Sequence, residues 1–102
     1  MSLLAAFATH SVDPSGEVLD TAIQEAQKAI SMDPGLARAH AALADAYTRK
    51  GWMVKALEEA KTAIDLNPNS DLGYVQLGRV YQITGRIDEA YAQFRKALAL
   101  NP

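Results

Sequence analysis

The sequence has 102 residues and contains no cysteine. Disulfide bonds, thiolate catalysis and cysteine-ligated zinc are therefore excluded for this chain. An excess of charge of one sign is also lacking, because 10 basic and 12 acidic residues leave a formal net charge of −2. Proteins that bind nucleic acid normally carry a clustered basic surface, so we do not expect nucleic acid as a partner.

Long apolar runs are missing as well. The opening segment 1–10 is apolar, but it is too short to span a bilayer and lacks the positively charged start of a secretory signal. We therefore expect a soluble, cytoplasmic protein without membrane contact. Apolar residues make up 49% of the chain and charged residues 22%, as in globular domains. Only four prolines and few β-branched residues, with much alanine, favour an all-α fold.

A repeated pattern runs through the chain. Pro34, Pro68 and Pro102 are spaced 34 residues apart. The same interval separates Leu43 from Leu77, Tyr47 from Tyr81, Gly51 from Gly85, Ala56 from Ala90 and Ala63 from Ala97. So many matches at one spacing indicate a stack of repeated units.

Each repeat divides into two helices. Gly51 and Gly85 stand where the first helix must stop and the chain must turn, and a proline follows the second helix. The expected helices cover 3–12, 16–31, 37–50, 53–66, 71–84 and 87–100. Because the loops are short, successive helices should pack antiparallel. Close approach is expected at the small residues Ala44, Gly78, Ala56 and Ala90, with Leu43, Tyr47, Leu77 and Tyr81 filling the space around them.

The third repeat carries a specific motif: Tyr74-x-x-Leu77-Gly78-x-x-Tyr81, then Ala90-x-x-x-Phe94, then Pro102. It resembles the tetratricopeptide repeat, with a tyrosine in the usual tryptophan position. The second repeat matches this pattern more loosely, and the first matches only over 22–34. We therefore expect one domain, 1–102, with a degenerate first repeat at 3–36, a second at 37–70 and a third at 71–102.

The resemblance implies a right-handed superhelical stack of helix hairpins, in which the first helices line the concave side. Such a surface suits a peptide or a helix of a partner protein, so the predicted function is protein–protein interaction as a scaffold or adaptor. The inward-facing positions are Arg38, Ala41, Ala42, Asp45, Thr48 and Arg49, and Leu72, Val75, Gln76, Arg79, Gln82 and Ile83. These side chains favour a ligand with acidic groups beside apolar anchors. The alternative is that Arg79 merely pairs with Asp45.

One subtype of the family binds the acidic C-terminal tails of heat-shock chaperones. It uses lysine and asparagine from the first helix, asparagine from the third, and lysine and arginine from the fifth. The matching positions in this sequence are Phe7, Ser11, Ala42, Leu72 and Gln76. None of them carries the charge of that clamp, so chaperone tails are not expected partners.

No residue pattern indicates catalysis, a cofactor or a metal. Neither His10 nor His40 has a second histidine or a carboxylate at metal-ligand spacing, and His40 replaces an aromatic packing residue of the repeat. Glu58 and Glu59 are mixed with lysines, as on a solvated helix face. Signatures of a nucleophile or a phosphate-binding loop are missing too. We therefore expect no enzyme, no cofactor, no metal and a partly buried, structural His40.

Two further features leave alternatives open. Trp52 follows a turn glycine and is either an exposed anchor for a partner or local packing. The last expected helix has no polar capping helix after it and would expose Tyr91, Phe94 and Leu98. Such an end indicates either a segment of a longer protein or burial by a second copy, and we hypothesise both together. Self-assembly as a structural unit is the alternative function. RNA binding is a third, weaker alternative.

Overall fold

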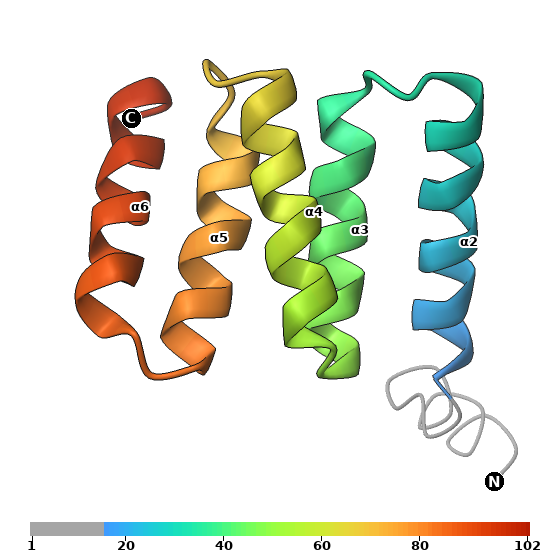
Figure 1. Cartoon of the computed structure of the whole chain (residues 1–102), viewed down its shortest axis with the longest axis horizontal. Helices are drawn as coiled ribbons and strands as arrows, with labels where there is room; N and C mark the ends of the chain where they lie inside the picture. Colours follow the sequence, from blue (N-terminus) through green and yellow to red (C-terminus); the bar gives the residue numbers. More distant parts are fainter. Residues whose placement is uncertain (1–15) are drawn as a thin grey trace, which may run out of the picture.

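The computed structural model describes residues 16–102, which form five helices that run alternately up and down side by side (Figure 1). They are α2 Glu17–Met32, α3 Ala37–Lys50, α4 Met53–Leu66, α5 Asp71–Ile83 and α6 Ile87–Leu100. This confirms the all-α prediction: α2 is shifted by one residue and α5 ends one residue early relative to the expected ranges. The helix expected at 3–12 lies outside the described residues.

The turns within the two hairpins α3–α4 and α5–α6 depend on glycine. Gly51 has φ 84°, a left-handed conformation that L-residues with a side chain rarely adopt. The Gly51 amide donates to the carbonyl oxygen of Thr48 at 3.0 Å, and the Trp52 amide donates to that of Tyr47 at 2.9 Å. Gly85 has the same φ and makes the equivalent turn. Free carbonyls at the end of the first helix are thereby satisfied while the chain reverses.

The helices form two layers. The first helices, α3 and α5, contact each other directly, and each also packs on the second helices beside it. Within residues 16–102 the second helices α2, α4 and α6 make no close backbone contact with one another. The layer of first helices is therefore the more closely spaced one, as on the inner side of a curved stack.

Small residues set the distance between the helices. Ala44, Ala56 and Ala60 have no solvent exposure at all. The large side chains expected around them are buried too: Leu43, Tyr47, Leu77 and Tyr81 are at most 8% exposed. The predicted division between small contact residues and large space-filling residues is confirmed.

The two hairpins fill one equivalent contact in different ways. In α5–α6, Phe94 packs so tightly on Gly78 that a Cβ there would lie 2.5 Å from the Cε1 atom of the ring. In α3–α4 the equivalent positions are Ala44 and Ala60, both fully buried. A glycine is thus required in the third repeat because an aromatic ring occupies the space.

Candidate partner-binding site

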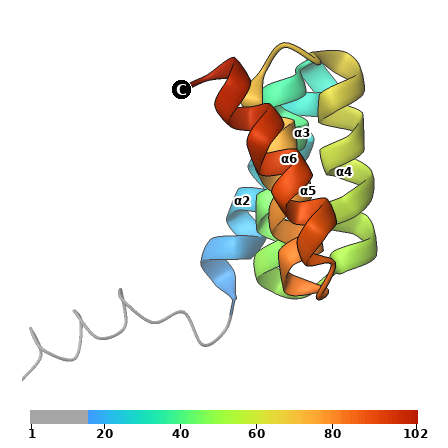
Figure 2. The same ribbon diagram turned by 90° about the vertical axis from the view of Figure 1, so that its left-hand side faces the viewer.

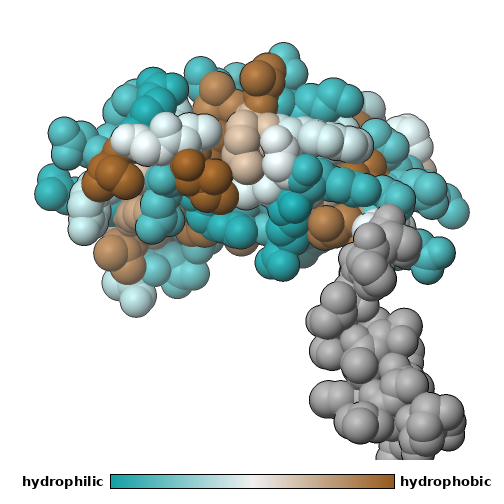
Figure 3. All heavy atoms as spheres, turned by 90° about the horizontal axis from the view of Figure 1, so that it is seen from below, coloured by the Kyte–Doolittle hydropathy of each residue, from teal (hydrophilic) through white to brown (hydrophobic). Residues whose placement is uncertain are grey.

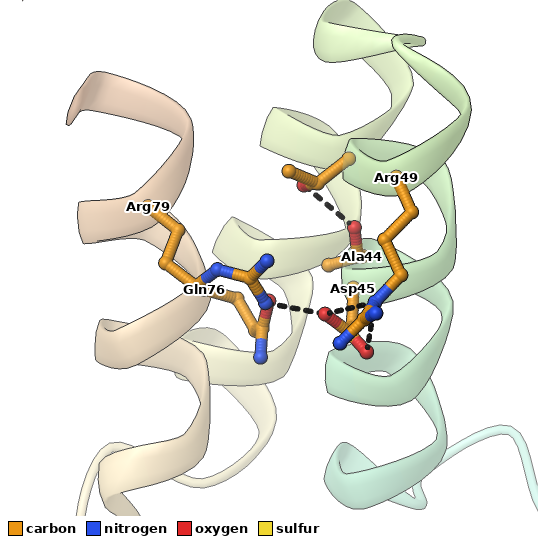
Figure 4. Close-up of polar contacts among 6 residues, drawn as sticks. Ala44, Asp45, Arg49, Gln76 and Arg79 are labelled. Carbon is orange, nitrogen blue, oxygen red and sulfur yellow. Dashed lines mark hydrogen bonds and ion pairs between the residues drawn. The ribbon is translucent and has the colours of Figure 1, made fainter. Parts of the chain in front are cut away.

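The layer of first helices carries a cluster of charged side chains centred on Asp45, which lies on α3. Its carboxylate accepts hydrogen bonds from two arginines (Figure 4). The Arg49 Nε atom, one turn along α3, is 3.3 Å from both carboxylate oxygens. Arg79 reaches the same carboxylate from α5 and also lies 3.5 Å from the Oε1 atom of Gln76. Two positive charges share one negative charge, so the Asp45 cluster keeps a surplus positive charge.

The pairing of Arg79 with Asp45, which the sequence left open as an alternative to ligand binding, is present, but it is not a buried ion pair. The side chains of Arg79 and Asp45 are 33% and 32% exposed, and Arg49 is more exposed than either. Ion pairs in contact with water contribute only about 0–1 kcal/mol to the free energy of unfolding. An incoming carboxylate therefore meets little resistance to taking over one of the arginines.

Apolar side chains lie beside the Asp45 cluster on α5. Leu72 and Ile83 are exposed, and Val75 is half-buried. Leu72 also borders a hollow of about 440 Å³ between the two inter-repeat linkers, together with the exposed Arg38. The full lining of this hollow is Gly35, Leu36, Ala37, Arg38, Leu66, Asn67, Ser70 and Leu72. Seven of the residues predicted to be inward-facing thus combine charge with apolar surface: Arg38, Asp45, Arg49, Leu72, Val75, Arg79 and Ile83.

Two of the residues predicted to face inward, Ala41 and Thr48, are not accessible. Ala41 is only 4% exposed, because it shares a helix face with the buried Ala44 and Thr48, at i+3 and i+7. Thr48 is also buried and its hydroxyl donates to the carbonyl oxygen of Ala44 at 2.9 Å. Ala42 and Gln82, in contrast, are exposed. The accessible part of the face formed by α3 and α5 is therefore narrower than the sequence pattern predicted.

Trp52 packs against its own hairpin. Its ring centroid is 5.7 Å from that of Tyr47, and the Nζ atoms of Lys50 and Lys55 lie 5.5 and 5.0 Å from the indole ring. Arg86, the equivalent residue one repeat later, covers Tyr81 at 4.4 Å in the same way. In both hairpins the side chain at this position covers a tyrosine of the preceding helix. Because Trp52 is nonetheless half-exposed, its role as a partner anchor stays a prediction.

His40 is partly buried, as expected, and links three segments. Its Nδ1 atom is 2.7 Å from the Oε1 atom of Glu59 on α4, and its Nε2 atom is 3.1 Å from the carbonyl oxygen of Pro34. The sequence pattern placed Glu59 on a solvated face and missed this contact. Within residues 16–102 there is no group of three or more His, Cys, Asp or Glu side chains able to hold a metal ion.

None of the helices between residues 16 and 102 has both the length and the apolar character needed to cross a membrane.

Comparison with known proteins agrees with this architecture. Two family models, both described as tetratricopeptide repeat, match residues 37–70 and 72–102. None of the curated proteins matches the sequence closely enough to count as a relative.

Three solved structures have the same fold. MamA superposes with a TM-score of 0.72 and 30% identity, over 91% of this chain and 52% of MamA. MamA MSR-1 C2 gives 0.70 and 25%, over 81% of this chain and 48% of that one. The second TPR of Spaghetti (RPAP3), bound to the HSP90 peptide SRMEEVD, gives 0.74 and 24%, over 81% of this chain and 77% of that one. This chain therefore spans about half the length of either MamA structure.

The two consecutive family matches cover well over half of the 102 residues. The helix hairpins, the glycine turns and the paired layers agree with these matches. Tetratricopeptide repeats are typically a non-enzymatic fold that mediates protein interaction. This chain belongs to the tetratricopeptide-repeat family.

Proposed function

We propose that the face formed by α3 and α5 binds an extended peptide segment of a partner protein, so that the domain acts as a scaffold or adaptor. The observation that carries this proposal is the Asp45 carboxylate, shared by Arg49 and Arg79 from two adjacent repeats. A carboxylate of the ligand would satisfy the guanidinium group that Asp45 satisfies only in part. The second TPR of Spaghetti, which has the same fold, is bound to a peptide, and this supports a peptide as the ligand.

The spacing along α5 defines the ligand more closely. Leu72, Arg79 and Ile83 follow one another at i, i+7 and i+11, which places them on one face of the helix. At a rise of 1.5 Å per residue, Leu72 lies about 10 Å and Ile83 about 6 Å from Arg79 along the axis. An extended peptide advances about 3.3 Å per residue. The ligand should therefore carry an acidic residue with apolar residues about three positions to one side and two to the other.

Chaperone tails stay excluded in this proposal. Three of the clamp positions lie within residues 16–102, and none of them carries a positive charge: Ala42, Leu72 and Gln76. The other two clamp positions, Phe7 and Ser11, lie outside the described residues. The peptide SRMEEVD is therefore a useful comparison ligand, because it is acidic but lacks the proposed apolar spacing.

Fluorescence anisotropy with labelled peptides tests the proposal. The probes are a Leu-x-x-Glu-x-Leu peptide, its reversed order Leu-x-Glu-x-x-Leu, the same peptides with Gln for Glu, and SRMEEVD. We expect one order to bind at least about tenfold more tightly than its Gln form and than SRMEEVD, because a charge-assisted hydrogen bond contributes about 1.5–3 kcal/mol. Equal affinity for the Glu and Gln peptides would contradict the proposal.

Two variants of the Asp45 cluster should change peptide affinity in opposite directions. Arg79→Glu should abolish binding, whereas Asp45→Asn should strengthen it by releasing both arginines for the ligand. Lys61→Glu, an equal change of charge at an exposed position of α4, is the control and should leave affinity unchanged. If Arg79→Glu and Lys61→Glu had the same effect, binding would depend on net charge and not on this face.

A further inference from the structure

The outer side of α6 carries an uncovered apolar stripe, formed by Ile87, Tyr91, Phe94 and Leu98. Tyr91 and Leu98 are 61% and 62% exposed, and Phe94 is half-buried because its ring also packs on Gly78. Figure 2 looks onto this helix, and no helix of residues 16–102 lies over it. A hollow of about 260 Å³ at the α5–α6 junction opens on the stripe, lined by Gln82, Ile87, Ala90, Tyr91 and Phe94.

The equivalent surface of α4 is covered. Leu57 and Ile64 precede Tyr91 and Leu98 by one repeat, and both pack against the core cluster shared with α5. Gly73 of α5 sits directly on Ile64: a Cβ added to it would lie 2.7 Å from the Cγ1 atom of Ile64. The α6 stripe is thus a position at which this fold normally receives another helix.

The spacing of the stripe fits a helix pair. Its four residues follow at intervals of four, three and four, which is the a/d spacing of a coiled coil. In an antiparallel pairing of two copies, Ile87 of each would face Leu98 of the other, and Tyr91 would face Phe94. The contact is then self-complementary about a twofold axis between Tyr91 and Phe94, as in most homodimers.

Charge supports a second copy as the occupant. Asp88 and Arg95 are exposed, lie along the same edge of the stripe, and form no ion pair with any residue of 16–102. Antiparallel pairing brings Asp88 of each copy near Arg95 of the other, whereas parallel pairing leaves the two edges on opposite sides of the contact and forms no such pair. Figure 3 shows several separate apolar groups toward the side of the molecule that carries α6, and others near its middle. We propose that α6 pairs with α6 of a second copy in an antiparallel, twofold-symmetric dimer.

Sedimentation equilibrium of the whole chain tests this dimer, with circular dichroism to check that each variant stays helical. The native chain should dimerise at tens of micromolar or below. Leu98→Glu should abolish the dimer by placing a charge in the stripe. Val54→Glu changes an apolar residue of α4 that is more exposed than Leu98, at 75% against 62%, and should leave dimerisation unchanged.

A charge exchange tests the orientation. Asp88→Arg and Arg95→Asp should each weaken self-association about tenfold or more, because each replaces two attractions by repulsions. Mixed together, the two variants should form a heterodimer of near-native affinity. Parallel pairing or a contact elsewhere would give no recovery on mixing, which would overturn the proposal.

A native chain that stays monomeric up to about 100 μM would also overturn it. The stripe would then be covered by a helix of another protein or by a further segment of a longer chain. The surface is separate from the Asp45 cluster, so the dimer test and the peptide test can fail independently.

Discussion

The hairpins α3–α4 and α5–α6 share one 34-residue pattern and differ in their surroundings. Leu57 and Ile64 of α4 are packed beneath α5, whereas the equivalent Tyr91 and Leu98 of α6 are exposed to water. An apolar residue at these positions is therefore core in one hairpin and surface in the other. The repeat pattern specifies a contact face, and only a neighbouring helix converts that face into core.

A second difference lies inside the hairpins. The α3–α4 pair meets through Ala44 and Ala60, and the α5–α6 pair through Gly78 and Phe94. Each contact combines residues whose sizes complement each other, but the volume is divided differently. Helix spacing in such a stack therefore depends on the pair of residues and not on either residue alone.

The largest expected difference in the free energy of unfolding is between truncating the covered Ile64 and truncating its exposed equivalent, Leu98. Ile64→Ala should lower the free energy of unfolding by about 2 kcal/mol, because it leaves a cavity beneath α5. Leu98→Ala should change it by less than about 0.5 kcal/mol at low protein concentration, because Leu98 has no covering helix within residues 16–102. Urea unfolding measures both values, and equal losses would mean that the two hairpins do not differ in the way described.

The next largest effect is at Gly78, where the same substitution should lower stability in one background and raise it in another. Gly78→Ala should destabilise the fold by about 1–2 kcal/mol, because the added Cβ would collide with the Phe94 ring. In a Phe94→Ala background the same change should instead stabilise the helix by up to about 1 kcal/mol, because the double variant reproduces the Ala44 and Ala60 pair of the other hairpin. A double-mutant cycle by thermal or urea unfolding measures this coupling. The absence of coupling would show that the ring is free to move away.

A smaller effect is expected at the Asp45 cluster. Asp45→Asn should reduce the free energy of unfolding by less than about 1 kcal/mol, because both ion pairs are partly exposed. The equivalent position of the next repeat is Arg79 itself, so this contact joins the two hairpins. A loss of several kcal/mol in urea unfolding would show that the cluster holds the hairpins together and is unavailable to a ligand.

The smallest effect concerns acid titration in α5–α6. Hydrogen bonds from the Arg86 guanidinium hold the pKa of Glu89 below its ordinary value, and the same pair raises the pKa of Arg86. A lowered pKa in the folded state means that this contact stabilises at neutral pH and is lost as pH falls through that pKa. Arg86→Gln should move the Glu89 pKa upward, as followed by carboxyl-carbon NMR. An unchanged titration would mean that the pair does not persist in solution.

Local features of the fold were predictable from the sequence. The five described helices and the turn glycines follow from helix periodicity, proline positions and the φ values that only glycine adopts readily. The buried alanines at the helix contacts were predictable too, because they recur at the 34-residue interval. Each of these features depends on a few neighbouring residues or on the repeat itself.

Contacts between distant side chains were decided by the tertiary structure. Ala41 is buried by neighbouring helices despite its inward-facing pattern, and Glu59 meets His40 from another helix. The sequence offered Asp45 and Arg79 as a pair, but not the second arginine on the same carboxylate. Helix periodicity fixes the direction of a side chain to within a face, whereas the choice of partner within that face depends on how adjacent helices approach each other. The sequence by itself therefore determined the stack of hairpins, and the packing between hairpins decided which of its residues a partner can reach.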